Sequence, residues 1–84
     1  MTNRSDLREM IGSCVEDEMD YAIIVTDTFD YTTYAVGVKD ELFKEVYIKL
    51  RNAPMSMIME VYNLGLDIER QLRENRAFHY PPWW

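Results

Sequence analysis

The chain has only one cysteine and one histidine among its 84 residues, and these scarcities exclude several kinds of protein. A single thiol, Cys14, cannot form a disulfide within the chain, which fits a reducing compartment. One cysteine and one histidine cannot supply the four ligands of a structural zinc site in a monomer. We therefore expect a fold held together by apolar packing, with no metal and no cofactor.

Long apolar runs are also missing. No stretch approaches the ~20 apolar residues that a membrane span needs. The polar start MTNRSDLRE has no signal-peptide core. The sequence predicts a soluble cytoplasmic protein that makes no membrane contact.

Catalytic signatures are equally scarce. The sequence holds no glycine-rich phosphate loop, no activated-serine motif and no HExxH stretch. His79 adjoins a proline-rich tail, where a satisfied or solvated imidazole is expected. Cys14 falls on an apolar helical stripe, as a small core residue does. We therefore expect a protein that is not an enzyme.

Positive charge is scarce in the first thirty residues. That stretch holds eight acids and two bases, and eight minus two accounts for the whole net charge of −6. The rest of the chain carries seven acids and seven bases, which cancel. This asymmetry indicates a positively charged partner and argues against direct nucleic acid binding.

The length allows one small domain, residues 1–84. A domain of this size buries only about 60–65% of the surface that its unfolded chain exposes. Without disulfides or metal, self-association is the remaining natural source of stability, so a homo-oligomer is one expected state.

Apolar spacing predicts a helix over residues 6–19. Two runs rich in β-branched and aromatic residues, 22–29 and 32–38, predict an antiparallel hairpin. Alternation places Ile23 on one face of the first strand and Ile24 on the other.

The second half predicts more helices. Asp40 is expected to cap a helix over residues 41–52, which Pro54 follows. Residues 55–62 are interpreted as a third helix, with a strand as the alternative.

The last segments depend on a glycine. Gly65 either ends the third helix or lies within one long helix. If it ends the helix, Asp67 caps a fourth helix over residues 68–78, with Phe78 inward. Two prolines exclude a helix from the tail, residues 79–84. Its tryptophans either fold back on the domain or dock on another surface.

The end of the first helix breaks a local rule. Carboxylates there oppose the negative end of the helix macrodipole, and no Lys or Arg lies within one turn. An uncompensated misfit of this kind indicates either function or a tertiary partner elsewhere in the fold. We expect a partner-binding acidic face of Glu9, Glu16, Asp17 and Asp20. A merely solvated acidic face is the alternative.

Two further sets of side chains are candidate ligand sites. Asp27 and Asp30, at the hairpin end, suit either a divalent cation or local turn bonds, and we favour the turn. Arg73 and Arg76 suit either a salt-bridged helix face or phosphate. In the sharper version of the phosphate alternative, the two arginines bind phosphate while aromatic residues of the tail stack a base. That candidate ligand site comprises Arg73, Arg76, Tyr80, Trp83 and Trp84.

The segments VTDTFDYTTYAVGV and MEVYNLGLDIERQLRENRAFHY together resemble a group of small uncharacterised proteins of tailed bacteriophages. The resemblance covers residues 21–80 and carries no assigned site. It implies action in the host cytoplasm, as an inhibitor of a host or anti-phage defence protein or as a protein that sequesters a small nucleotide signal.

We thus expect an α+β domain: an N-terminal helix, an antiparallel β-hairpin, and two or three helices packed on it. The expected function is that of a non-enzymatic phage inhibitor that binds a basic protein surface through its acidic face. The alternative is an oligomer that binds a small nucleotide.

Overall fold

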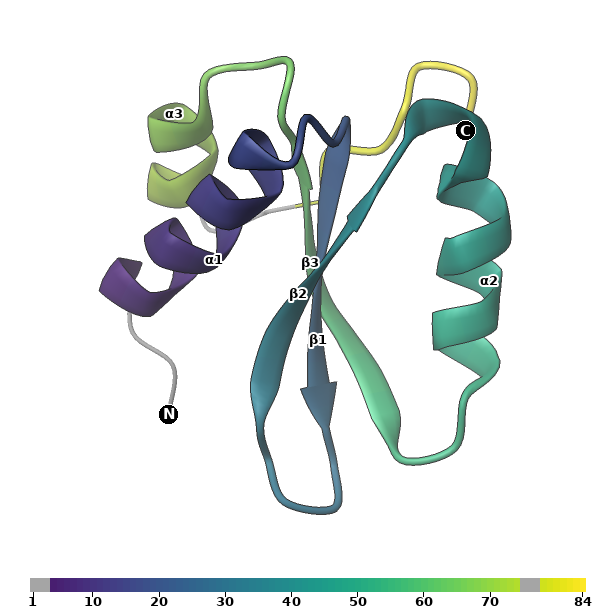
Figure 1. The fold of residues 1–84 in the computed structure, drawn as a ribbon. Helices are drawn as coiled ribbons and strands as arrows, with labels where there is room; N and C mark the ends of the chain where they lie inside the picture. The colour runs from purple at the N-terminus through teal and green to yellow at the C-terminus, as the bar shows by residue number, and fades with distance from the viewer. Residues whose placement is uncertain (1–3, 75–77) are drawn as a thin grey trace.

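The computed structural model describes residues 4–74 and 78–84 and has an α+β fold, as expected (Figure 1). Three strands, three α-helices and a 3-10 helix follow one another along these residues. They are α1 Arg4–Glu16, β1 Tyr21–Asp27, β2 Thr33–Val38, the 3-10 helix η1 Asp40–Leu42, α2 Phe43–Asn52, β3 Ser56–Asn63 and α3 Ile68–Arg73.

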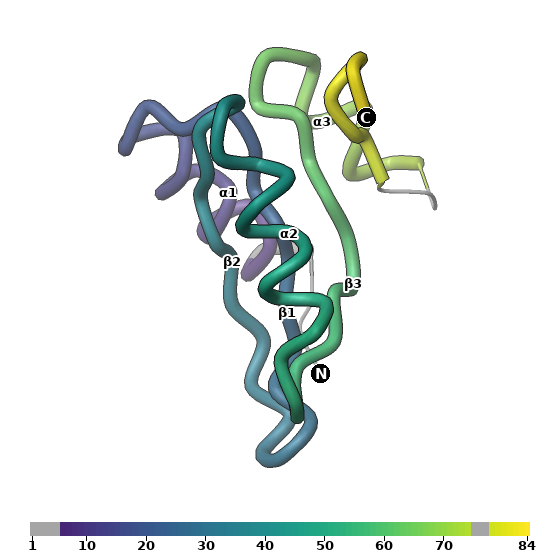
Figure 2. The backbone as a smooth tube through the Cα atoms, turned by 90° about the vertical axis from the view of Figure 1, so that its right-hand side faces the viewer, coloured from purple at the N-terminus to yellow at the C-terminus, as the bar shows by residue number. Residues whose placement is uncertain are grey.

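The strands form one antiparallel sheet in the order β2-β1-β3, with helices on both faces. Ile24 packs in a core cluster with residues of α1 and α3, while Ile23 packs in a second cluster with Phe43 of α2. Figures 1 and 2 show the same layers from two sides. The predicted hairpin and its two faces are confirmed, and residues 21–25 are all buried because β1 is covered on both faces.

The helix expected over residues 55–62 is wrong, because this segment is strand β3. Methionine and glutamate favour a helix locally, but β1 has a second edge that needs backbone partners. β3 fills that edge and buries Val61 and Tyr62 against the two clusters. The strand alternative was therefore the right one.

Several element ends also differ from expectation. α1 ends at Glu16, because Glu18 adopts a left-handed conformation with φ of 59°. Asp40 does not cap α2, since it lies inside η1, and Lys39 precedes it without a side-chain cap. A further correction concerns Phe78, expected to point inward, whose side chain is 46% exposed.

The break at Gly65 is confirmed, although the element before it is a strand. Gly65 lies in the turn between β3 and α3, and Asp67 caps α3 by accepting from the Arg70 N–H at 3.3 Å. α3 ends at Arg73 instead of residue 78, because the backbone becomes extended at Glu74.

The tail folds back onto its own domain. The Trp84 ring lies 5.5 Å from the Phe43 ring and stacks on Tyr80 at 5.5 Å. Trp83 donates its indole N–H to Asp40 Oδ1 at 3.0 Å. The Pro81 residue is buried. The two tryptophans are therefore bound to α2 and η1, which settles the alternative left open by the sequence.

Candidate functional site

The turn that follows α1 is closed by three backbone bonds. The N–H groups of Asp17, Glu18 and Met19 donate to carbonyls of the last helical turns at 3.0–3.1 Å. Glu18 occupies the left-handed position that helices usually give to glycine. A side chain with a Cβ is disfavoured there, so this helix end is locally suboptimal in backbone as well as in charge.

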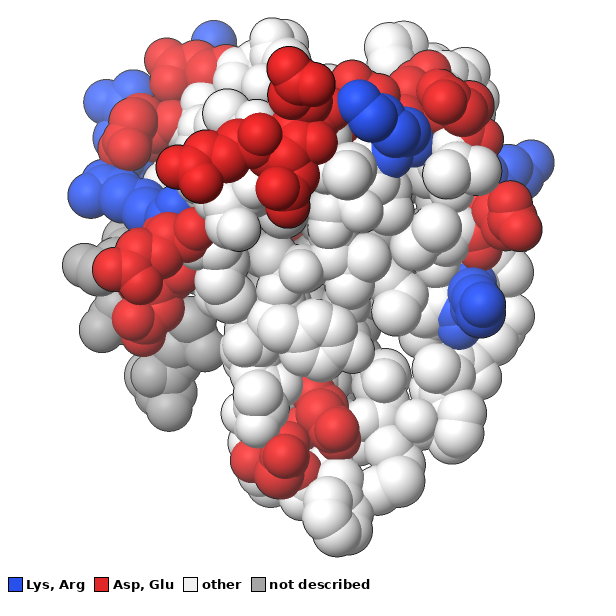
Figure 3. All heavy atoms as spheres, viewed as in Figure 1, with Lys and Arg blue, Asp and Glu red and all other residues white. Residues whose placement is uncertain are grey.

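The carboxylates of this turn are exposed. None of the ion pairs between side chains that the structure describes involves Glu9, Glu16, Asp17 or Glu18. Figure 3 shows carboxylates gathered across the upper part of the face that it displays, above a broad uncharged area. We call Glu9, Glu16, Asp17 and Glu18 the acidic surface.

Asp20 has a different place from its neighbours. Its carboxylate is half-buried, and Oδ2 accepts from the Asp40 N–H at 2.8 Å. It therefore caps η1 from another element, in the way that a residue next to a helix N-terminus does. Asp20, which the sequence placed in the acidic face, therefore makes a hydrogen bond within the fold.

One cation reaches the end of α1 across space. Lys39 Nζ donates to the backbone carbonyl of Glu18. The sequence could not place this contact, because the two residues are 21 positions apart. Lys39 offsets part of the negative potential at the helix end, while the carboxylates of the acidic surface stay unpaired within the described side chains.

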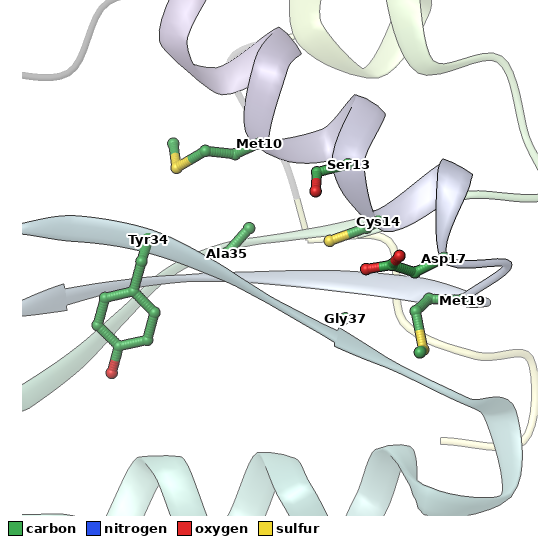
Figure 4. A pocket seen from close by; sticks show the side chains of 8 residues that line it. All are labelled: Met10, Ser13, Cys14, Asp17, Met19, Tyr34, Ala35 and Gly37. Atoms are coloured by element: carbon green, nitrogen blue, oxygen red, sulfur yellow. The ribbon is translucent and has the colours of Figure 1, made fainter.

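A cleft of about 330 Å³ lies between α1 and β2 beside the acidic surface (Figure 4). Ser13 of α1 and Asp17, which follows α1, contribute polar groups, and Tyr34 and Ala35 line the cleft from β2. Its remaining lining is largely apolar, formed by Met10, Cys14, Met19 and Gly37. A cleft whose lining mixes apolar side chains with a carboxylate suits an apolar side chain flanked by a cation.

Two residues of this cleft are constrained by packing. A Cβ at Gly37 would lie 2.7 Å from Met19 Cγ, so this position has no room for a larger side chain unless Met19 moves. Burial, reinforced by the Asp17 carboxylate, raises the pKa of the Cys14 thiol above its ordinary value. Cys14 is thus a packed core residue with little thiolate near neutral pH.

Arg73 and the tail aromatics lie on different faces of the sheet. Arg73 is exposed on α3, which packs with α1 on one face of the sheet. Tyr80, Trp83 and Trp84 contact α2 on the other face. Arg76 lies outside the described residues.

Other contacts of α3 and the tail favour a salt-bridged helix face over a phosphate site. Arg70 pairs with Glu74 at 3.3 Å, as on a salt-bridged helix face. The cleft between Lys44 and the two tryptophans measures about 140 Å³. Ligand pockets usually measure about 300–1,000 Å³. The nucleotide alternative stays a prediction that this geometry does not favour.

The hairpin carboxylates make local turn bonds. Asp27 Oδ1 accepts from the Phe29 N–H at 2.8 Å, and Asp30 Oδ1 accepts from the Thr32 N–H at 3.0 Å. The Thr32 bond lowers the pKa of Asp30. No cluster of three or more metal-ligating side chains occurs within residues 4–74 and 78–84. The turn interpretation is therefore the one that the geometry supports.

Sequence reasoning missed an apolar surface at the hairpin end. Phe29 and Tyr31 are 76% and 78% exposed there. Three methionines in or just before β3, Met55, Met57 and Met59, are about half exposed. Their spacing of two residues is a strand signal that could have revealed them, and it was hidden by the helical interpretation of the segment.

Comparison with known proteins gave no match to a family model, to a curated protein or to a solved structure. Across the described part of the chain, every helix is too short or too polar to cross a lipid bilayer.

Proposed function

We propose that this protein is a non-enzymatic interaction protein that binds a basic surface of another protein through its acidic surface. The phage resemblance of the sequence supports a more specific version, in which the protein inhibits a host or anti-phage defence protein in the host cytoplasm. The charge arrangement supports the chemistry of the partner, and the resemblance alone supports its biological setting.

One observation carries the proposal. Glu16, Asp17 and Glu18 of the acidic surface lie at the C-terminal end of α1. The macrodipole, the neighbouring carboxylates and the left-handed Glu18 act against stability there, and Lys39 offsets only part of the negative potential. A sequence selected for stability alone would place Lys, Arg and Gly there. Features that lower stability in this way are expected at functional sites, where residues are retained for binding and not for folding.

The test is capture from a bacterial lysate with three baits at low and high salt. The baits are the wild type, Glu16→Lys and Glu45→Lys. Glu45→Lys is the matched control, because it makes the same charge change at an exposed position of α2. We expect a protein that wild type and Glu45→Lys retain at low salt, that high salt releases, and that Glu16→Lys does not retain. Equal retention by all three baits, or no specific capture by the wild type, would overturn the proposal.

A further inference from the structure

β2 is an edge strand without the usual protection. Its sequence TYAVGV holds no charged residue and no proline, which are the devices that natural edge strands use against pairing. The outer edge of β3 is partly covered by the tail, because the His79 N–H donates to the Val61 carbonyl at 3.0 Å. β2 thus presents the open edge of the sheet and lies in front of β1 in Figure 1. Figure 3, drawn from the same side, shows an uncharged area below the carboxylates.

The register identifies which backbone groups of β2 point outward. The Asp27 N–H donates to the Thr32 carbonyl at 2.8 Å, and the pairs Thr26–Thr33 and Ile24–Ala35 follow in register. Hydrogen-bonded and non-bonded pairs alternate in an antiparallel ladder, so the N–H and C=O groups of Thr33 and Ala35 point away from β1. No turn or loop bond within the described residues uses these groups.

Negatively charged side chains lie at both ends of the β2 edge. Beyond its first residue lies Asp30, whose carboxylate bonds the Thr32 N–H. Beside its last residues lies the acidic surface, with Asp17 lining the same cleft as Gly37. Lys39 follows the strand, but its ammonium group is engaged by the Glu18 carbonyl. An uncharged centre between two acidic ends suits an occupant that is apolar in the middle and basic at both ends.

We propose that β2 accepts an extended segment of the basic partner as a fourth strand of the sheet. This inference rests on the proposed function and names the way in which the partner binds. Strand addition draws affinity from main-chain bonds and specificity from pockets for alternate side chains. The outward groups of Thr33 and Ala35 provide the bonds, and the cleft between α1 and β2 provides a pocket of about 330 Å³ beside the edge.

A second copy of the chain is a poorer occupant. Two β2 edges paired antiparallel would bring the Asp30 end of one copy against the acidic surface of the other. Like charges directly opposed across a strand pair are destabilising. The same charges attract a strand that begins and ends with lysine or arginine.

The experiment uses a synthetic peptide of six alternating valines and threonines with two lysines at each end. Amide exchange of the full chain is followed residue by residue by NMR, with and without millimolar peptide. We expect exchange at Thr33 and Ala35 to slow by at least about tenfold, while Tyr34 and Val36, which already pair with β1, change little. The same peptide with glutamates in place of lysines should give no protection.

Two variants at one position separate the backbone bond from folding. Ala35→Pro removes an N–H that points outward, so it should abolish the protection at Thr33 while the ladder to β1 survives. Ala35→Ser keeps the N–H and should bind like the wild type. If Ala35→Pro does not fold, the exchange pattern of the wild type still decides.

Three outcomes would overturn the inference. One is the absence of slowed exchange at Thr33 and Ala35, and another is equal protection by the glutamate peptide. The third is a dimer by native mass measurement with both amides protected before peptide is added. If strand addition fails while Glu16→Lys still abolishes lysate capture, the proposed function stands and only this binding mode is wrong.

Discussion

At the scale of single residues, Asp20 and Tyr80 join elements that are distant in the sequence. Asp20 bonds the start of η1, and the Tyr80 hydroxyl lies 3.2 Å from the Tyr47 hydroxyl on α2. Both side chains are polar groups at the margin of an apolar cluster. Each therefore makes a contribution to stability that can be measured separately from binding.

Asp20→Ala should lower the free energy of unfolding by about 1 kcal/mol, because it leaves the Asp40 N–H without its acceptor. Asp20→Asn, which keeps an acceptor oxygen, should recover most of that loss. Urea unfolding followed by circular dichroism measures both. Asp17→Ala, at an exposed position, is the control and should change stability by less than about 0.5 kcal/mol. Equal effects of the Asp20 and Asp17 variants would refute the capping role.

Burial and the bond with Tyr47 raise the pKa of Tyr80 to about 12. An unfolded phenol ionises near pH 10, so between about pH 10 and pH 12 the unfolded chain loses a proton that the folded chain keeps. The stabilising contribution of Tyr80 is thus complete below about pH 10 and is lost as pH rises through this window. Urea unfolding at about pH 9 and pH 11 should show the loss, and Tyr80→Phe should reduce it. A pH dependence that Tyr80→Phe leaves unchanged would contradict the assignment.

At the scale of elements, the end of α1 combines acidic side chains at the negative end of the helix macrodipole with a left-handed residue that is not glycine. α2 shows the ordinary arrangement, with Glu45 in its first turn and Lys49 and Arg51 in its last. Exchanging a glutamate for lysine should therefore have opposite effects on the two helices.

Glu16→Lys should raise the free energy of unfolding by about 0.3–1 kcal/mol, because it places a cation at the negative end of α1. Glu45→Lys should lower it by a similar amount, because it places a cation at the positive end of α2. Thermal and urea unfolding measure both. Glu16→Lys is thus expected to bind less but to be more stable, and Glu45→Lys to bind normally but to be less stable. A loss of binding in Glu16→Lys therefore cannot be caused by unfolding. A destabilised Glu16→Lys would disprove this account of the helix end.

The elements differ in how far the sequence could predict them. Residues 21–25 are buried on both faces, so composition alone marked the strand, and the capping role of Asp67 was local enough to predict. The strand at 56–63 depended on a free edge of β1, whose paired residues lie about thirty to forty positions away. The contacts of Asp20 and Lys39 likewise join positions about twenty apart. Local propensity carries no information about such pairs.

At the scale of the whole molecule, the tail closes one side of the domain and leaves the β2 edge open. Phe43 lies at the centre of the closed side, in ring contact with Tyr47, Tyr80, Trp83 and Trp84. A domain this small has little apolar area to bury, so these packed aromatic rings are a substantial source of its stability.

Trp84→Ala should lower the free energy of unfolding by about 1–2 kcal/mol, since the ring is only half exposed and packs against the rings of Phe43, Tyr47 and Tyr80. Phe29→Ala, whose ring is 76% exposed at the hairpin end, is the matched control and should change stability little. Differential scanning calorimetry measures both. Similar melting temperatures for the two variants would show that the tail does not support the domain.

Binding of a basic protein surface by the acidic surface is measured most directly as the affinity of the captured partner for the wild type, Glu16→Lys and Glu45→Lys. Isothermal titration calorimetry across a salt series gives these affinities. We expect an affinity that falls steeply with salt for the wild type and Glu45→Lys, and that is about tenfold or more weaker for Glu16→Lys at low salt. One affinity for all three proteins, unchanged by salt, would show that the acidic surface does not bind the partner.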